Sequence, residues 1–392
     1  MKYILFDDAA RQNLLPFTHT RPVADIRCGI LTMRQRWEIH LDASTSTLTE
    51  NYLQSVFPLN GGDDNLYING SVFANKALAA SINSLPQGQK LVKGDILIAA
   101  RLVESNLNIS GFHSCISALP ANDFNGDMYS LKNVWDIFSL NDLAIRDDFE
   151  LITKGRISAP IPNEITVSGK EHLFIEEGSK IYAGCIINAD AGPVYIGKNT
   201  EILEGAMMRG PLAVCEHGVI KMGAKIYGAT TIGPGCKVGG EINNTVFFAN
   251  SNKAHDGYLG NSVIGEWCNL GADTNCSNLK NNYDEIKIWS EYKGKLIPTG
   301  LIFCGLLMGD HSKCGINTMF NTGTVAGVSC NIFGAGFPEK FILSFSWGGS
   351  ESMVTYQFDK AMETANRMMG RRGLQLSEQE KEMYRYIFEQ CR

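Results

Sequence analysis

The chain has 392 residues, of which 44% are hydrophobic and 19% are charged, and its formal net charge is −6. This length exceeds that of one ordinary hydrophobic core, so we expect two domains with appendages. The mild acidic excess argues against a nucleic-acid-binding surface. No apolar run approaches the length of a transmembrane helix, so we do not expect a membrane as a partner. Because of the charge, we do not expect nucleic acid either.

The cysteines and the amino terminus indicate the compartment. The eleven cysteines are an odd number and form no Cys-x-x-Cys pair, so we expect reduced thiols that fill the core as small side chains. The segment from Met1 to Asp8 is too short and too acidic for a signal peptide. The sequence therefore predicts a cytoplasmic protein.

The first 165 residues mix two kinds of short segment. β-rich runs at Tyr3 to Phe6, Leu66 to Ile68 and Asp95 to Val103 alternate with helix-compatible stretches such as Asp25 to His40. This alternation predicts an α/β domain over residues 1–165, including a linker. The linker begins with a helix-like segment, Val134 to Arg146, before a proline-containing junction.

Beyond this domain, an apolar or sulfur-containing residue occupies every sixth position. The uninterrupted run is Ile196, Ile202, Met208, Val214, Ile220, Ile226, Ile232 and Val238. Related positions are Ile175, Ile181 and Ile187 upstream, and Met308, Cys314, Phe320, Ala326 and Ile332 downstream. Neither an α-helix nor a flat strand has this period. A chain that turns a corner every six residues stacks one inward side chain on each face, so we predict a parallel β-helix over residues 166–345.

The ladder of inward residues is interrupted twice. The first interruption contains the polar run Asn250 to Gly257, after which the ladder is expected to resume at Tyr258, Ile264, Leu270 and Cys276. The second, Ser277 to Gly300, is too polar for a coil and is expected to project as a loop. Because a solenoid core needs only its repeat, we expect function at these interruptions.

The last segment, residues 346–392, has a different composition and predicts two amphipathic helices. They span Phe358 to Gly370 and Ser377 to Gln390, and Ser377 with Glu380 has the spacing of a capping box. Such helices would cover the open end of the β-helix, whose last coil otherwise exposes strand edges.

His255 lies in the first interruption and is the strongest candidate for chemistry. Lys253 and Tyr258 flank it, and Glu241 and Asn269 lie about one coil away. A base, an orienting acid and hydrogen-bonding groups would then converge. A surface histidine without a role is the alternative interpretation.

Two further histidines, His217 and His311, are expected at loops or corners. They lack the spacing of a three-histidine metal site, which argues against zinc.

Three segments carry a resemblance to a known family: Lys253 to Gly260, Asn269 to Thr274 and Cys276 to Asn278. They resemble the acetyltransferase half of bacterial bifunctional N-acetylglucosamine-1-phosphate uridylyltransferase/glucosamine-1-phosphate acetyltransferases, which is a left-handed hexapeptide β-helix. The opening Asn13 to Pro22 and the segment Gly309 to Gly315 are similar to a divergent, Bacteroidetes-type branch. The resemblance implies acetyl-CoA as a substrate, an amino-sugar phosphate as acceptor and a homotrimer with sites between neighbours.

The resemblance also implies roles for individual residues. His255 would be the general base, Glu241 the acid near it, and the backbone amide of Ala272 the donor to the oxyanion. Positions that would line the sugar-phosphate pocket are Tyr258, Asn269, Asn278 and Lys225, and those that would contact acetyl-CoA are Ala272, Asn317 and Ala335.

One position departs from the family pattern. Asn243 stands where the family has a lysine for the sugar phosphate, so the charge must come from Lys253, Lys280 or Arg209.

The amino-terminal domain resembles sugar nucleotidyltransferases in an altered form. Leu15 to Pro22 is similar to a stretch that ends in Arg-Pro-Lys, but Val23 stands at the lysine, and Asn69 stands where a metal-binding aspartate is expected. Asp7 to Asn13 replaces the glycine-rich phosphate loop. An active domain would use Arg21 and Arg11 to hold a nucleoside triphosphate, with Mg²⁺ at Asn69; the alternative is a relic used for assembly or docking.

Three functional hypotheses follow. The first is acetyl-CoA-dependent N-acetylation of an amino-sugar phosphate of the glucosamine 1-phosphate type, coupled or not to nucleotidyl transfer that forms a UDP-sugar. The second is a sugar-1-phosphate nucleotidyltransferase using UTP or dTTP, whose β-helix serves only for oligomerisation. The third is a structural or binding protein without catalysis.

Overall fold

The computed structural model describes residues 1–105 and 107–391, and its internal contacts divide the chain into two compact units. The amino-terminal unit comprises Met1–Ile26, Leu31–Asn133 and Ser377–Tyr386. The β-helix unit comprises Arg27–Ile30, Val134–Leu376 and the residues from Ile387 on. These units are defined by contacts, and the domain limits 1–165, 166–345 and 346–392 stay predictions.

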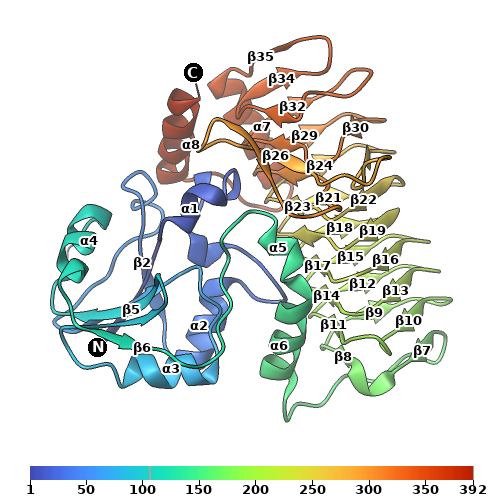
Figure 1. Ribbon diagram of the computed structural model, residues 1–392. Helices are drawn as coiled ribbons and strands as arrows, with labels where there is room; N and C mark the ends of the chain where they lie inside the picture. Colours follow the sequence, from blue (N-terminus) through green and yellow to red (C-terminus); the bar gives the residue numbers. More distant parts are fainter. Residues whose placement is uncertain (106, 392) are drawn as a thin grey trace. The chain divides into compact units, whose positions relative to one another are not determined.

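The amino-terminal unit combines a sheet with helices, as expected for an α/β domain, and the sheet contains both parallel and antiparallel pairs (Figure 1). In spatial order its strands are β2 (Thr45–Leu48), β1 (Lys2–Phe6), β3 (Asn65–Asn69), β5 (Ile96–Leu102), β4 (Gln89–Lys93) and β6 (Ala121–Asp123). Its helices are α1 (Ala10–Asn13), α2 (Met33–Leu41), α3 (Lys76–Asn83) and α4 (Ile109–Ser117).

Alternation along the strands of this sheet sends side chains into two separate cores. Leu5 and Ile68 join one apolar cluster, whereas Phe6 and Tyr67 join the other, as the two-residue period of a strand requires. The expected helix Asp25 to His40 was too long, because α2 begins only at Met33, where Thr32 forms a capping box with Gln35.

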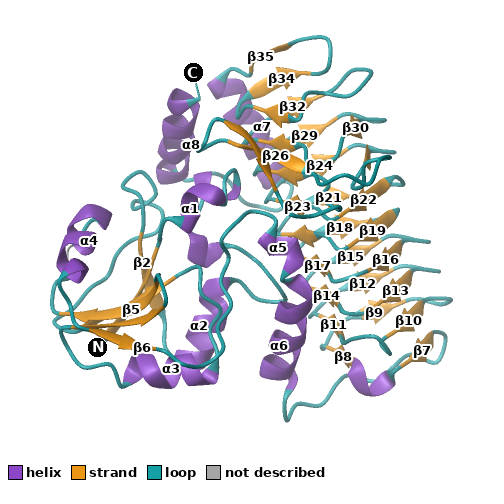
Figure 2. Cartoon of the chain, in the orientation of Figure 1, coloured by secondary structure: helices purple, strands orange, loops and turns teal. Residues whose placement is uncertain are grey.

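The second unit is a left-handed parallel β-helix of about ten turns. Figure 2 shows its strands as stacked rows joined by short loops. Face 1 contains β7 (Thr166–Ser168), β10 (Ile186–Asn188), β13 (Met207–Arg209), β16 (Lys225–Tyr227), β19 (Glu241–Asn243) and β22 (Tyr258–Gly260). Face 2 contains β8 (Leu173–Ile175), β11 (Val194–Ile196), β14 (Leu212–Val214), β17 (Thr230–Ile232), β20 (Val246–Phe247), β23 (Val263–Ile264), β28 (Leu307–Met308), β31 (Val325–Ala326) and β33 (Phe341–Ile342).

The third row completes the prism. Face 3 contains β9 (Lys180–Ile181), β12 (Glu201–Ile202), β15 (Val219–Ile220), β18 (Lys237–Val238), β21 (Asn252–Lys253), β24 (Asn269–Leu270), β29 (Lys313–Cys314), β32 (Asn331–Ile332) and β34 (Ser346–Gly348), and ends with antiparallel β35 (Met353–Thr355). Two further strands, β25 (Asn275–Cys276) and β30 (Met319–Phe320), pair with each other.

The predicted ladder is confirmed, because every residue of its uninterrupted, upstream and downstream runs lies in one buried cluster. The first predicted interruption was wrong. The coils continue through Ile242, Phe247, Lys253 and Leu259, and the inward residue of β22 is Leu259, not Tyr258. Shorter corners replace the strict period of six here, so the signal was lost while the coil persisted.

The second predicted interruption contains more structure than a loop. Within Ser277 to Gly300 the chain forms an antiparallel hairpin of β26 (Lys287–Ser290) and β27 (Lys295–Pro298). Ile286 and Ile288 are buried, and the Trp289 ring stacks on Phe341 with centroids 5.4 Å apart.

Helices cover part of the β-helix. α5 (Asp136–Ser139) and α6 (Asn141–Thr153) pack beside face 2, where the Asn141 amide donates to the Ala229 carbonyl at 2.6 Å. α7 (Phe358–Gly370) and α8 (Glu378–Gln390) confirm the two predicted tail helices, and Ser377 and Glu380 bond reciprocally.

The end of the β-helix is covered as expected. The Phe345 ring of the last coils packs against Phe358 of α7 and Phe388 of α8, with centroids 6.1 and 5.1 Å apart.

All eleven cysteines are free, and nine of them are buried, as the sequence predicts. Among the described residues, no helix is both long and apolar enough to span a bilayer.

Candidate functional site

His255 lies at a corner of the β-helix, between β21 on face 3 and β22 on face 1, and its side chain is exposed. Its corner stacks on the tighter corner Gly239-Gly240 of the preceding coil. A Cβ on Gly240 would lie 2.8 Å from the His255 carbonyl oxygen. Glycine at this position therefore lets the two corners approach closely.

Tyr258 and Asn278 come together beside this corner. The Asn278 amide donates to the Tyr258 hydroxyl at 3.0 Å and to Asn261 Oδ1 at 2.8 Å. The Tyr258 ring folds over Gly260, where a Cβ would lie 2.3 Å from the hydroxyl oxygen. The pair presents a half-buried phenol and an oriented amide, and burial raises the pKa of Tyr258.

Glu241 occupies the coil before Tyr258, in register with Lys225 and Tyr258 on face 1. Its carboxylate accepts a hydrogen bond of 2.6 Å from the Tyr227 hydroxyl. This hydrogen bond, together with burial, raises the pKa of Tyr227 to about 12. Within the described chain no hydrogen bond joins Glu241 to His255, so the expected orienting contact is not present.

The residues expected to contact acetyl-CoA follow His255 along one edge. Asn269, Lys313 and Asn331 are in register on face 3, and each strand leads into a corner on the same edge that carries Ala272, Asn317 or Ala335. Three coil steps of about 4.8 Å therefore separate the His255 corner from that of Ala335, or about 14 Å.

Two features of this edge suit a ligand. Among the described residues no backbone carbonyl accepts from the Ala272 N–H, while the Ala272 carbonyl accepts from Asn317 at 2.8 Å. A cavity of about 320 Å³, lined by Phe333, Gly334, Trp347 and neighbouring residues, opens at the Ala335 corner.

The positive charges expected for the sugar phosphate are not all available. Lys225 and Arg209 are exposed on face 1. Lys253 is wrong as a phosphate ligand, because it points into the prism and is 0% exposed. Asn269 lies on face 3 beside Asn252, at 3.5 Å, across the corner from Tyr258.

Lys280, the other expected cation, is hydrogen-bonded within its own loop, where its ammonium donates to the Glu285 carbonyl at 2.5 Å.

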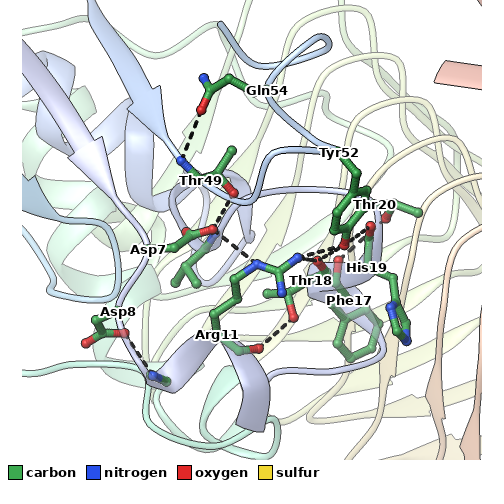
Figure 3. A network of polar contacts seen from close by, with 12 residues as sticks. Asp7, Asp8, Arg11, Phe17, Thr18, His19, Thr20, Thr49, Tyr52 and Gln54 are labelled. Atoms are coloured by element: carbon green, nitrogen blue, oxygen red, sulfur yellow. Dashed lines mark hydrogen bonds and ion pairs between the residues drawn. The ribbon is translucent and has the colours of Figure 1, made fainter. Parts of the chain in front are cut away.

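In the amino-terminal unit, the candidate nucleotide ligand Arg11 is bound within the protein (Figure 3). Its guanidinium donates to the Thr18 carbonyl at 2.5 Å and the Tyr52 hydroxyl at 2.8 Å, and it pairs with Asp7 at 3.3 Å. Asp7 also accepts from Thr49 at 2.6 Å. Burial raises the pKa of Asp7 to about 6. Arg11 is therefore used for structure, which its position in the sequence did not indicate.

Asn69 does not fit a metal ligand. Its Oδ1 accepts from the Ser71 amide at 2.9 Å and hydroxyl at 2.7 Å, and its Nδ2 donates to Asp8 at 2.8 Å and to the Leu97 carbonyl at 2.9 Å. In the described chain no group of three or more His, Cys, Asp or Glu side chains is placed to hold a metal ion. Arg21, the other expected ligand, is 6% exposed.

Sequence reasoning missed Tyr227 and Asn261, which complete the polar surface of face 1. Tyr227 was hidden because it is in register with Asn243, and only the direction of its side chain brings the hydroxyl to the Glu241 carboxylate. Asn261 has a positive φ of 47° at the turn after Gly260, and the dipeptide Gly260-Asn261 was the available turn signal.

The chain is similar to known proteins of two kinds, sugar nucleotidyltransferases and acetyltransferases. A family model described as "Sugar nucleotidyl transferase" matches residues 3–157. The bifunctional protein GlmU of Methanococcus maripaludis (strain C5) is 29% identical over 220 residues, which cover 56% of this chain and 46% of that protein. The putative uncharacterized acetyltransferase YaiX of Escherichia coli (strain K12) is 30% identical over 170 residues, 42% of this chain and 73% of that protein.

A solved UDP-N-acetylglucosamine acyltransferase from Francisella novicida aligns with a TM-score of 0.28 at 12% identity, covering 59% of this chain and 89% of that one.

These findings define the class as a sugar nucleotidyltransferase-like domain joined to a hexapeptide acetyltransferase fold. The chain belongs to the acetyltransferase family that includes YaiX, and it is also similar to the bifunctional GlmU proteins. It spans about half the length of the GlmU relatives that it matches.

Proposed function

We propose that this protein transfers the acetyl group of acetyl-CoA to the amino group of an amino-sugar phosphate of the glucosamine 1-phosphate type. The observation that carries the proposal is the single edge of the β-helix along which His255, Ala272, Asn317 and Ala335 follow one another. Membership of the acetyltransferase family supports the reaction type.

The chemistry follows from the positions of these groups. The sugar amine attacks the thioester carbonyl, a C–N bond forms, the C–S bond breaks, and the thiolate leaves and is protonated. An imidazole accepts a proton near neutral pH, and the exposed His255 ring would take the proton that the amine loses. The Ala272 N–H would donate to the oxygen that becomes negative during attack.

Face 1 would hold the sugar phosphate. Tyr258 and Asn278 offer a phenol and an amide for sugar hydroxyls, and the exposed cations Lys225 and Arg209 lie on the same face. Acetyl-CoA would extend from His255 toward Asn317, Ala335 and the cavity at Phe333.

We further propose that the site is completed between copies in a homotrimer. Ile316 and Met222 are 71% and 67% exposed although apolar, and exposed apolar side chains favour association. Light scattering at micromolar concentration should give three times the chain mass, and a monomer would contradict the proposal.

Replacement of His255 by Ala tests the acetyl transfer. With acetyl-CoA and glucosamine 1-phosphate, the rate of thiol release should fall by a factor of about 10² to 10⁴, the usual contribution of a general base. His217→Ala is the matched control, since His217 is another exposed corner histidine and lies at the edge between faces 2 and 3, away from this edge. Undiminished turnover in His255→Ala would remove His255 from the mechanism.

Nucleotidyl transfer is the second candidate function, because the family model matches residues 3–157. Mg²⁺ would supply charge for the phosphates in such a reaction, but Asn69 and its neighbours do not fit a metal site, so no step is assigned to it. Pyrophosphate release with UTP or dTTP and a sugar 1-phosphate tests this activity separately.

A further inference from the structure

One lysine lies inside the β-helix, in a row that is otherwise apolar. Lys253 is 0% exposed and pairs in register with Val238 of the preceding coil. The other inward residues of face 3 are Ile181, Ile202, Ile220, Val238, Leu270, Cys314 and Ile332. A charged side chain in such a core is costly unless it is fully hydrogen-bonded.

The ammonium group of Lys253 is satisfied by backbone carbonyls alone. Its Nζ donates to the carbonyls of His255 at 2.9 Å, Asp256 at 3.1 Å and Gly239 at 3.4 Å. Three N–H groups therefore meet three acceptors. Among the described residues no other group donates to these three carbonyls, and no ion pair involves Lys253.

These contacts determine the shape of the corner that carries His255. The ammonium draws the carbonyls of His255 and Asp256 inward, and it ties them to Gly239 in the coil below. The His255 side chain is left on the outside of the prism, where it is exposed. An apolar side chain in place of Lys253 would leave three inward carbonyls without a donor.

We propose that Lys253 is a positioning residue, which holds the His255 corner from inside the β-helix so that the imidazole faces the sugar amine. This proposal rests on the proposed acetyl transfer at His255. It replaces the expectation that Lys253 binds the sugar phosphate, which its burial contradicts.

The alternative is that Lys253 only fills the core. Two controls separate the roles. Ile220→Ala removes an inward side chain of the same row, two coils below, and leaves the His255 corner intact. Lys237→Met removes an exposed lysine from the neighbouring strand of the same face.

Steady-state kinetics with acetyl-CoA and glucosamine 1-phosphate provide the first test. Lys253→Met should lower kcat about 100-fold with the KM for acetyl-CoA within about twofold, because displaced catalytic groups cost such factors. Lys253→Gln, which keeps two N–H donors, should recover part of kcat. The proposal would be overturned if Lys253→Met had the same kcat as Ile220→Ala. It would also be overturned if KM and kcat fell together in these two variants.

Amide hydrogen exchange provides a second readout that does not depend on activity. The Gly239 and Glu241 amides donate to the Lys253 and Gly257 carbonyls at 2.7 and 3.2 Å. In Lys253→Met, exchange of these two amides should accelerate at least tenfold, while exchange in the strands of face 2 stays within twofold of wild type. Unchanged exchange of the corner would refute the positioning role. If wild-type protein shows no acetyl transfer, the proposed function fails, and the exchange result still decides whether Lys253 holds the corner.

Discussion

The end of β1 and the His255 corner are the two places where the family resemblance puts chemistry, and they use polar groups in opposite ways. After β1, side chains hold one another: Asp7 pairs with Arg11, and Asn69 is bonded on both its oxygen and its nitrogen. At the corner, a buried amine holds backbone carbonyls, and the His255 ring stays exposed. Side chains that bond to one another within the protein are not available to a substrate. At the corner, the buried amine bonds only to the backbone, so the His255 side chain remains available.

The largest expected effect comes from breaking the side-chain network after β1. In Arg11→Met the buried carboxylate of Asp7 loses its counter-charge, and the Thr18 carbonyl and Tyr52 hydroxyl lose a donor. Removing one partner of a buried pair costs about 3–5 kcal/mol. Urea denaturation, monitored by hydrogen exchange in β1 and β3, should show this loss in the free energy of unfolding of the amino-terminal unit.

An exposed pair supplies the control for Arg11→Met. Arg367 pairs with Glu363 on α7 with side chains 77% and 59% exposed, so Arg367→Met should cost about 0–1 kcal/mol. If Arg11→Met costs no more than this control, Arg11 is not structural and its expected role as a nucleotide ligand returns.

A smaller effect is expected from restoring the family's aspartate in Asn69→Asp. The new carboxylate would face Asp8 and the Leu97 carbonyl, at positions where Asn69 now donates at 2.8 and 2.9 Å. Loss of these bonds should destabilise the amino-terminal unit by about 1–3 kcal/mol.

Millimolar Mg²⁺ should recover part of this loss, because two neighbouring carboxylates attract the cation. Thermal denaturation of the wild type, Asn69→Ala and Asn69→Asp with and without Mg²⁺ checks this. A wild-type melting temperature raised by Mg²⁺ would show that Asn69 and its neighbours bind the metal after all.

The fold was largely readable from the sequence, because the six-residue period is a direct consequence of stacked corners. Met208 and Cys314 followed this period and are buried as predicted. The prediction failed between Val238 and Leu259, where corners shorten and an inward position is held by Lys253. A search for regularly spaced apolar residues cannot identify a core position that is occupied by a polar residue.

The candidate site was only partly predictable, for a related reason. Spacing along the chain placed Glu241 and Asn269 about one coil from His255, and the strand register agrees. The direction of a side chain depends on neighbours from other coils. The bond of Glu241 to Tyr227 and the inward turn of Lys253 could therefore be seen only in the structure.

The smallest expected effect is a pH dependence that separates stability from activity. Burial lowers the pKa of Lys253 from 10.5 to about 8, against an opposing influence of Asp256, Cys314 and Asp273. Between these two values the unfolded chain binds more protons than the folded one, so stability contributed by this group rises with pH. From pH 7 to 8.5 the gain should be roughly 1 kcal/mol.

The same deprotonation removes one of the three N–H donors from the corner, so kcat of acetyl transfer should fall as stability rises. Comparison with Lys253→Met isolates this group, because Lys313, whose pKa burial also lowers to about 8, titrates in both proteins. Urea denaturation and kcat are measured at pH 7, 8 and 9 for wild type and Lys253→Met. With rising pH, the free energy of unfolding of wild type should increase relative to that of Lys253→Met. Over the same range, the kcat of wild type should fall toward that of Lys253→Met. Parallel pH profiles in the two proteins would mean that the charge on Lys253 neither costs stability nor holds the corner.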